Sequence, residues 1–249
     1  MKKPFWKIVN EVIQKCDIIL EVADARFPLE SRNEELEKKV KRAGKKLIVV
    51  LNKCDLVSKD LLDKIKNKIP DSVFVSSKEN LGTTILRKKI LKSARGKEVV
   101  AGVVGYPNTG KSSLINMLKH SKATGTSSYA GFTKAKQFVR IDRKIVLIDT
   151  PGVLQYMERD ESKLALLNAI SPSNLKEPDM PAMEIIEKFA NENPSALENF
   201  YGIELKGDAC ETLEEIALKM KKFRKKGEPD TDSASRKIVD DWQKGKISL

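Results

Sequence analysis

Residues 105–112 read Gly-Tyr-Pro-Asn-Thr-Gly-Lys-Ser, and this complete G-x-x-x-x-G-K-S pattern constrains the fold more than any other feature of the chain. An apolar run precedes it and an amphipathic run follows it, an order that predicts a strand, a phosphate-binding loop and a helix. The glycines let backbone N–H groups approach phosphate oxygens, while Lys111 neutralises the β and γ phosphates and the Ser112 hydroxyl ligates Mg²⁺. A chance match in a glycine-containing loop is the alternative, and the flanking strand and helix argue against it. The neighbouring residues expected to bind the nucleotide are Asn108, Thr109, Gly110 and Ser113.

Short apolar runs alternate with longer amphipathic stretches over the first two thirds of the chain, which is typical of βα units on a parallel sheet. We therefore expect an α/β fold with a six-stranded, mostly parallel sheet. Ser31 and Glu34 fit a capping box that would begin a helix over 34–42. The candidate strands are 17–24, 46–53, 72–77, 99–106, 137–142 and 144–150.

The last third of the chain has a different character. Residues 171–181 contain three prolines and predict a linker, and only helical patterns follow it. We expect one domain over 1–170, the linker, and a small helical domain over 182–249. Phe223 and Trp242 are expected to lie in helix cores.

Composition excludes several kinds of site. The single histidine, His120, cannot build a multi-histidine metal site, and Cys16, Cys54 and Cys210 lie too far apart in sequence to suggest a disulfide scaffold or zinc ribbon. No apolar run approaches the roughly 20 residues of a membrane span, and the first residues are too polar for a secretory signal. We therefore expect a cytoplasmic protein without a membrane partner. The net charge of +12 predicts a partner that carries phosphate.

A second motif, Asp-Thr-Pro-Gly at 149–152, ends an apolar run some 40 residues after the phosphate loop. This placement suits a nucleotide switch, in which Asp149 holds Mg²⁺ through water and the Gly152 N–H meets the γ phosphate. Taken alone, the motif is also an ordinary turn after a strand.

A switch of this kind needs a threonine that closes over Mg²⁺ when the γ phosphate is present. The candidates are Thr124, Thr126 and Thr133. We favour Thr133, because it precedes a predicted strand and follows Gly131, which permits a mobile loop; a simple turn threonine is the alternative.

Two further loops carry side chains suited to a purine base. Asn52-Lys53-Cys54-Asp55 follows an apolar run, and the Asp55 carboxylate can accept hydrogen bonds from guanine N1–H and N2–H₂, which adenine does not offer. The Lys53 stem would cover the base face, and Asn52 would tie the loop to its neighbours. The next predicted strand ends in Ser76, Ser77 and Lys78, from which a backbone N–H can reach guanine O6. Together the two loops favour GTP over ATP.

These motifs stand in an unusual order, because the base-reading loops precede the phosphate loop. Sheet domains tolerate this rearrangement when their natural termini lie close together. Over nearly its whole length the chain resembles the circularly permuted GTPases of the YlqF/YawG type, which act in assembly of the large ribosomal subunit. The segments that carry the resemblance are DARFP at 24–28, NKCD at 52–55, SSK at 76–78, GYPNTGKSS at 105–113, GFTK at 131–134 and DTPG at 149–152.

The resemblance implies a molecular switch that binds GTP or GDP with Mg²⁺, acts on the large-subunit precursor, and binds ribosomal RNA through its helical domain. Asn108 matches a loop asparagine that helps bind K⁺ in related GTPases. Val153 stands where Ras-like enzymes carry a water-orienting glutamine, so slow intrinsic hydrolysis is expected. The residues expected to carry catalysis are Lys111, Asn108, Thr133 and Gly152.

Two other functions fit part of the pattern. A metabolic kinase or synthetase uses the same phosphate loop but needs an acceptor pocket, and an RNA-binding scaffold could bind GTP without turnover. Within DARFP, Asp24 and Arg26 follow a strand end near the nucleotide, where a structural salt bridge and a functional contact are both compatible. No pattern requires a dimer, so we expect a monomer.

The positive charge is concentrated in the first part of the chain. Residues 1–160 hold 33 Lys and Arg against 18 Asp and Glu, whereas 161–249 hold 14 against 17. In the second part, the basic residues cluster in Lys219–Lys226. We therefore expect basic faces of both domains to contact RNA, with an affinity that falls steeply as salt rises.

Overall fold

The computed structural model describes residues 3–120, 137–149, 160–225 and 227–249. The chain forms two compact units, and neither is a single continuous stretch of sequence. The first unit contains 1–55 and 62–157, and the second contains 56–61 and 158–249.

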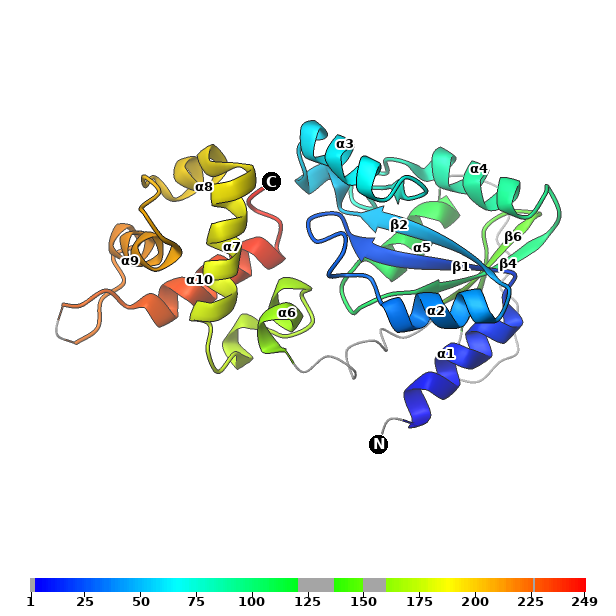
Figure 1. The fold of residues 1–249 in the computed structure, drawn as a ribbon, viewed down its shortest axis with the longest axis horizontal. Helices are drawn as coiled ribbons and strands as arrows, with labels where there is room; N and C mark the ends of the chain where they lie inside the picture. Colours follow the sequence, from blue (N-terminus) through cyan, green and yellow to red (C-terminus); the bar gives the residue numbers. More distant parts are fainter. Residues whose placement is uncertain (1–2, 121–136, 150–159, 226) are drawn as a thin grey trace. The chain divides into compact units, whose positions relative to one another are not determined.

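The first unit is built on a six-stranded sheet with the order β3-β2-β1-β4-β6-β5 (Figure 1). All neighbouring strands are parallel except β5 and β6, which are antiparallel. The expected α/β fold with a mostly parallel sheet is confirmed. The strands are β1 (Ile18–Asp24), β2 (Lys46–Asn52), β3 (Val73–Phe74), β4 (Val99–Val104), β5 (Gln137–Arg140) and β6 (Ile145–Asp149).

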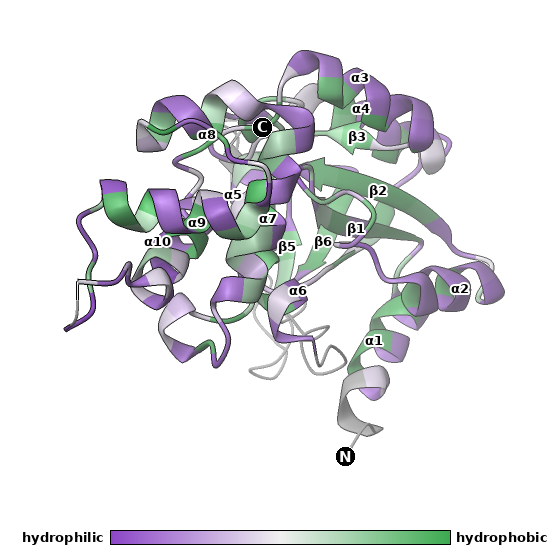
Figure 2. Ribbon diagram, turned by 60° about the vertical axis from the view of Figure 1, so that its left-hand side comes forward, coloured by the Kyte–Doolittle hydropathy of each residue, from purple (hydrophilic) through white to green (hydrophobic). Residues whose placement is uncertain are grey.

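Helices cover both faces of this sheet. Side chains alternate between the two faces along each strand, so the apolar residues of the strands project from both faces. The main apolar core lies on the α4 and α5 face, where Ile18, Leu20 and Val22 of β1 meet Leu114 and Leu118. In Figure 2 strands β1, β2 and β6 are coloured as hydrophobic, while α2 and α3 carry hydrophilic residues. The helices of this unit are α1 (Lys3–Lys15), α2 (Glu34–Arg42), α3 (Lys59–Lys68, whose first residues belong to the second unit), α4 (Thr83–Ser93) and α5 (Lys111–His120).

Helix α1 packs on the opposite face of the sheet through a glycine. A Cβ on Gly102 of β4 would lie 2.6 Å from Val12 Cγ1 and 2.9 Å from Cys16 Sγ, so any larger residue would push the helix away. Burial raises the pKa of the Cys16 thiol to about 12, which leaves it an unreactive core residue.

The start of α2 differs from the sequence prediction. Asn33, not Ser31, caps the helix, and its side chain accepts a backbone N–H of the first turn at 2.8 Å. Ser31 is buried instead, where its hydroxyl accepts the Asp24 N–H at 2.9 Å and donates to the Phe27 carbonyl. The predicted capping box of Ser31 and Glu34 is therefore wrong, because the Ser31 hydroxyl forms its hydrogen bonds within the turn after β1.

The second unit is a helical bundle around a tryptophan. Trp242 is fully buried, packs edge-to-face on Phe189 with ring centroids 6.1 Å apart, and donates its indole N–H to the Leu166 carbonyl at 3.0 Å. Its expected place in a helix core is confirmed. The helical segments are α6 (Glu161–Leu166), η3 (Pro172–Asn174), α7 (Asp179–Glu192), α8 (Pro194–Tyr201), α9 (Ala209–Lys219) and α10 (Thr231–Gln243).

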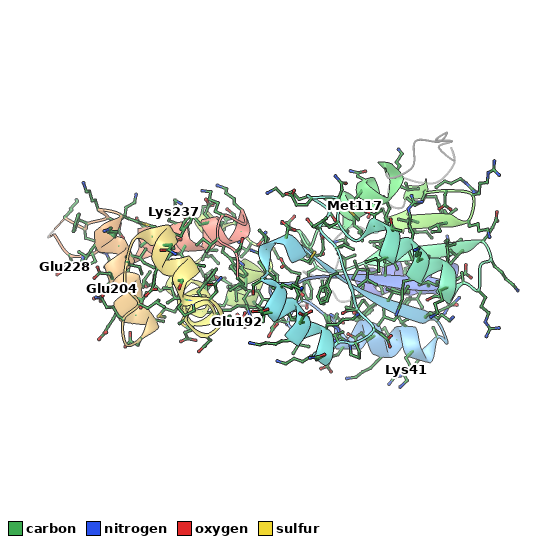
Figure 3. All side chains as sticks on the ribbon, turned by 90° about the horizontal axis from the view of Figure 1, so that it is seen from above. Lys41, Met117, Glu192, Glu204, Glu228 and Lys237 are labelled. Atoms are coloured by element: carbon green, nitrogen blue, oxygen red, sulfur yellow. The ribbon has the colours of Figure 1, made fainter. Side chains whose placement is uncertain are left out.

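A buried carboxylate, Asp241, lies near the end of α10 and is surrounded by donors. Asp241 accepts hydrogen bonds from Lys237, labelled in Figure 3, and from Lys246 at 2.8 Å. The Tyr201 hydroxyl donates to the same carboxylate at 3.3 Å. The hydrogen bonds and positive charges of these partners offset the free-energy cost of burying the Asp241 carboxylate.

The compact units do not follow the predicted boundaries, since the segment expected to be a linker packs within the second unit. Arg236 of α10 donates to the carbonyls of Pro172 and Leu175 at 2.6 and 3.1 Å, and Ser235 donates to Asp179 at 2.7 Å. Pro172 begins the 3₁₀ turn η3 and Pro181 lies in the first turn of α7, and the Arg236 guanidinium fixes the backbone at Pro172 and Leu175.

Phe223 does not lie in a helix core, so that prediction is wrong. Helix α9 ends at Lys219, Lys221 adopts a left-handed φ of +55°, and the chain turns so that Phe223 is 52% exposed. Opposite sides of this turn pair at Phe223 and Pro229.

The second unit also holds a short segment taken from the first half of the sequence. Leu249 donates its N–H to the Leu56 carbonyl at 2.9 Å and accepts the Ser58 N–H at 2.5 Å. Gly245, at a left-handed φ of +64°, lies against the Leu56 side chain. We call this pairing the Leu56–Leu249 clasp. It joins the residues directly after Asp55 to the end of the bundle.

Within the described residues, no helix combines the length and apolar character needed to cross a membrane.

Candidate nucleotide-binding site

The predicted site residues gather at one edge of the sheet. Strands β1, β2, β4 and β6 are parallel, so their carboxyl ends share that edge, where ligands bind in open α/β sheets. In register, Asp24 at the end of β1 lies beside Asn52 of β2, and Val103 of β4 lies beside Asp149 of β6. The loops that follow these strands therefore meet.

The phosphate loop has the backbone that its glycines require. Gly105 has a φ of +152° and its Cβ would lie 2.3 Å from the Val22 carbonyl oxygen, while Gly110 has a φ of +92°. Helix α5 begins at Lys111, so the backbone N–H groups of its first turn have no intrahelical acceptor and can serve an anion. Neither glycine can be replaced without displacing backbone or a neighbouring side chain.

Lys111 is the buried cation of this loop. The residue is 7% exposed, and its ammonium donates to the Tyr106 carbonyl at 2.5 Å. Burial lowers the pKa of Lys111 to about 8, and the Asp149 carboxylate partly opposes that effect. A bound phosphate would bring further negative charge next to this ammonium.

The other predicted residues of the phosphate site lie on the same loop and helix. Ser112 and Ser113 are exposed on the first turn of α5, and Asn108 is exposed at a left-handed φ of +57°. Thr109 is buried, and its hydroxyl donates to the Tyr106 carbonyl at 2.9 Å. Asp149, at the end of β6, is partly exposed. The predicted switch residues Thr133 and Gly152 lie outside the described residues, as do Thr124, Thr126 and Val153.

Asn52 connects the phosphate loop with both base loops. Its Nδ2 donates to the Thr109 carbonyl at 2.8 Å, and its Oδ1 accepts the Ser77 N–H at 3.0 Å and the Ser77 hydroxyl at 2.9 Å. A Cβ on Gly110 would lie 2.1 Å from the same Nδ2. One buried amide thus fixes three loops that are distant in sequence.

Asp55 has an unmet acceptor. Its Oδ1 is buried, and no group among the described residues donates a hydrogen bond to it. The residue sits in the short 3₁₀ turn Cys54–Leu56, whose start is fixed by the Cys54 N–H donating to the Val75 carbonyl at 3.1 Å. A buried acceptor without a donor is costly, which indicates a ligand that brings its own N–H groups.

The second base loop is a tight turn after β3. Ser76 is buried and pairs with Leu81 through two backbone hydrogen bonds, and its hydroxyl accepts the Glu79 N–H at 3.0 Å. Ser77 is partly buried, and Lys78 is exposed. The Ser77 N–H is bonded to Asn52 Oδ1 and the Glu79 N–H to the Ser76 hydroxyl, so the contact of this turn with a base oxygen stays a prediction.

The sequence alone gave DARFP no clear task. In the structure, this segment contacts the base loop through Asp24 and Lys53. The Asp24 carboxylate receives the Arg26 guanidinium through two hydrogen bonds, at 3.0 and 2.9 Å, and the Lys53 ammonium at 2.8 Å. The signal that could have predicted this contact is the position of the two residues. Asp24 ends β1, and Lys53 directly follows β2, the parallel strand beside β1.

The residues present fit a guanine nucleotide with Mg²⁺. The unmet Asp55 acceptor suits guanine N1–H and N2–H₂, and the glycines of the loop leave room for phosphate against backbone. Among the described residues, no three His, Cys, Asp or Glu side chains lie close enough to form a metal centre by themselves. A single carboxylate such as Asp149 with a serine hydroxyl suits Mg²⁺, which binds through few protein ligands together with phosphate and water.

A phosphate loop at the start of α5 and base loops on the preceding strands define a P-loop nucleotide-binding domain of permuted order. Comparisons with known proteins agree. A family model described as 50S ribosome-binding GTPase matches residues 100–197. An uncharacterized GTP-binding protein of Methanocaldococcus jannaschii is 44% identical over 251 residues, which is 99% of this chain and 67% of that protein. The chain belongs to the circularly permuted GTPases of the YlqF/YawG type.

Eukaryotic relatives are longer. A guanine nucleotide-binding protein-like 3 homolog of Caenorhabditis elegans is 32% identical over 98% of this chain and 49% of its own length. Nucleolar GTP-binding protein 2 of Yarrowia lipolytica is 32% identical, with 98% and 50% covered. The chain therefore spans two thirds of the archaeal relative and about half of these two.

Solved structures share the fold. GDP-bound YlqF aligns with a TM-score of 0.62 at 21% identity, covering 96% of both chains. YlqF from T. maritima bound to GNP aligns with a TM-score of 0.61 at 22% identity, covering 98% of this chain and 96% of the other. At such identities the agreement concerns the fold alone.

Proposed function

We propose that this protein is a cytoplasmic GTPase that hydrolyses GTP to GDP and phosphate and acts as a molecular switch in assembly of the large ribosomal subunit. The observation that carries nucleotide recognition is the Asn52 amide, which joins the phosphate loop to both base loops beside the unmet Asp55 acceptor. The description of the matching family as ribosome-binding, and the nucleolar relative, support the ribosomal part.

Each residue has a proposed task. Lys111 and the first-turn N–H groups of α5 bind phosphate oxygens. Ser112, Thr133 and, through water, Asp149 hold Mg²⁺, which neutralises phosphate charge. The Gly152 N–H meets the γ phosphate, and Asn108 helps bind K⁺. Hydrolysis is slow without a partner, because Val153 and not a glutamine stands directly after the Asp-Thr-Pro-Gly motif.

Base reading is tested by Asp55→Asn. Guanine offers two N–H groups to the carboxylate, whereas xanthine carries an oxygen in place of N2–H₂ and matches an amide better. We expect the variant to lose GDP affinity by about 100-fold and to prefer XDP, measured by competition with a fluorescent nucleotide. An unchanged preference for GDP would contradict the proposed role of Asp55. Asp63→Asn, on the exposed part of α3, is the control and should bind GDP normally.

Hydrolysis is tested in single-turnover reactions with GTP, in K⁺ and in Na⁺, with and without large ribosomal subunits. We expect a rate increase from K⁺ and a further one from the subunits. Bound GTP that is not hydrolysed under any of these conditions would favour the GTP-binding scaffold. Transfer of phosphate to a small acceptor would favour the kinase.

RNA contact is proposed for basic surfaces of both units. In the second unit, the turn after α9 exposes Phe223 between basic residues, and exposed aromatic rings among cations suit unpaired bases. The first unit contributes the longer stretch of positive charge. Binding should therefore weaken steeply between about 50 and 200 mM salt. Affinity that does not change with salt would assign the basic residues to nucleotide binding alone.

Sucrose-gradient sedimentation in GDP and in a non-hydrolysable GTP analogue tests the ribosomal partner. We expect comigration with large-subunit precursors in one nucleotide state and release in the other. If neither state comigrates, the role in assembly is refuted while GTP binding is not.

A further inference from the structure

We propose that Asp24 and Arg26 are positioning residues for guanine recognition, because they hold the Lys53 side chain in the place from which its stem covers the base. The inference rests on the proposed function and assigns a task to the DARFP segment.

The three side chains form one buried ion cluster. Arg26 donates from Nε to Oδ1 of Asp24 at 3.0 Å and from Nη2 to Oδ2 at 2.9 Å. The Lys53 ammonium approaches Oδ2 at 2.8 Å. Asp24 and Arg26 are each 1% exposed, so this is an interior cluster with little solvent screening.

Lys53 requires support of this kind. Its backbone has a φ of +62°, a left-handed conformation that disfavours a side chain with a Cβ. Burial lowers the pKa of Lys53, and the Asp24 carboxylate opposes that effect. Without Asp24, the ammonium would leave the interior for water and take its stem with it.

Arg26 fixes the direction of the carboxylate. Its guanidinium binds both oxygens in a fork, and its backbone N–H donates to Oδ1 at 3.1 Å. Burial alone would raise the pKa of Asp24, but the charges of Arg26 and Lys53 outweigh it and hold the pKa below its ordinary range. The carboxylate is therefore charged at neutral pH and can bind the Lys53 ammonium.

The backbone links the cluster to the base loop. The Ala25 N–H donates to the Asn52 carbonyl at 2.8 Å, which continues the β1–β2 register by one step. The Ser31 hydroxyl accepts the Asp24 N–H at 2.9 Å and keeps the turn closed. The DARFP turn is thus joined to the base loop through the backbone as well as through the ion cluster.

The alternative is a salt bridge that only stabilises the fold. The two readings differ in what the substitution Asp24→Asn changes. A purely structural pair affects unfolding, whereas a positioning pair affects the affinity for the base and spares the affinity for phosphate. Inorganic tripolyphosphate, which engages the phosphate loop without a base, separates the two.

The experiment measures GDP, ADP and tripolyphosphate affinities, together with the melting temperature of the nucleotide-free protein. Asp24→Asn should weaken GDP by about tenfold and tripolyphosphate by less than about twofold. Lys53→Met keeps the stem and removes the ammonium, so in that background Asp24→Asn should cost little more GDP affinity. Arg26→Lys, which keeps the charge and loses the fork, should give an intermediate loss and serves where Asp24→Asn does not fold.

A matched control exists in the same unit. Arg87 and Asp142 form another largely buried ion pair, at 3.0 Å, away from the proposed base site. Asp142→Asn should lower the melting temperature and leave GDP affinity unchanged. Equal losses of GDP and tripolyphosphate in Asp24→Asn, or a fall in melting temperature alone, would overturn the inference. A wild-type protein that binds ADP as well as GDP would refute guanine recognition itself, and the positioning role with it.

Discussion

Removing the Asn52 side chain should separate the three loops of the site. In Asn52→Ala the Thr109 carbonyl, the Ser77 N–H and the Ser77 hydroxyl all lose their partner. Asn52 is buried, so water does not readily replace these bonds. The hydroxyl can rotate toward another acceptor, whereas the two backbone groups cannot. At about 1–2 kcal/mol for each stranded backbone group, we expect a loss of about 2–4 kcal/mol in the stability of this region.

Hydrogen exchange followed by mass spectrometry measures this locally, which matters because two units need not unfold together. In the nucleotide-free protein, Asn52→Ala should speed exchange in the segments 72–82 and 105–114. Asn52→Asp keeps the acceptor for Ser77 but places an oxygen against the Thr109 carbonyl. It should therefore speed exchange in 105–114 and leave 72–82 protected.

Asn33→Ala provides the control, because Asn33 also uses its side chain to accept a backbone N–H but caps α2. It should cost about 1 kcal/mol and change exchange only around that helix. If Asn52→Ala left both site segments as protected as in the wild type, the three-loop linkage would be refuted.

Three more predictions follow from individual contacts. GDP affinity should fall as pH rises through about 8, because Lys111 loses its proton there. The free energy of unfolding of the nucleotide-free protein should instead rise from about pH 8 to about pH 10, because burying the charged ammonium opposes folding until it loses its proton. Titrations of binding and of unfolding with pH, for wild type and Lys111→Met, check both effects. Gly245→Ala should destabilise the Leu56–Leu249 clasp by about 1 kcal/mol, because φ is +64° and the new Cβ would lie 2.7 Å from Leu56 Cδ1, and faster hydrogen exchange at 244–249 is the expected sign. Trp242→Phe should lower the free energy of unfolding of the second unit by about 1–3 kcal/mol through the lost hydrogen bond to Leu166 and lost volume, measured by urea denaturation; an unchanged midpoint would contradict the packing described.

Much of the fold could be predicted because its signals are local. Each strand of the sheet is a short apolar run in the sequence, and the phosphate-loop motif predicts the strand before it and the helix after it. Asn52, Asp55 and Ser77 could be placed at one edge because parallel strands end together. Which hydrogen bonds join these loops could not be read from the sequence, because they depend on the register between strands.

The failures share a cause as well. Ser31 and Asn33 are both good caps, and the choice between them depends on Asp24, which needs the serine. The proline-rich segment before α7 looked like a linker because its anchor, Arg236, lies on the last helix. Phe223 fitted a helical pattern that a left-handed residue at 221 interrupts. In each case a contact distant in sequence decided the local structure.

The Leu56–Leu249 clasp has a consequence for how the protein is made. During synthesis the segment 56–61 leaves the ribosome long before its partners do, and it has to wait for Leu249 and Gly245 before its backbone hydrogen bonds can form. The helical bundle is therefore completed only after nearly all of the described chain exists, and a protein truncated at 157 would lack more than a tail. It would leave residues 56–61, which directly follow Asp55, without their partners. Folding of the segment next to the loop proposed to read the base therefore depends on the last residues of the described chain.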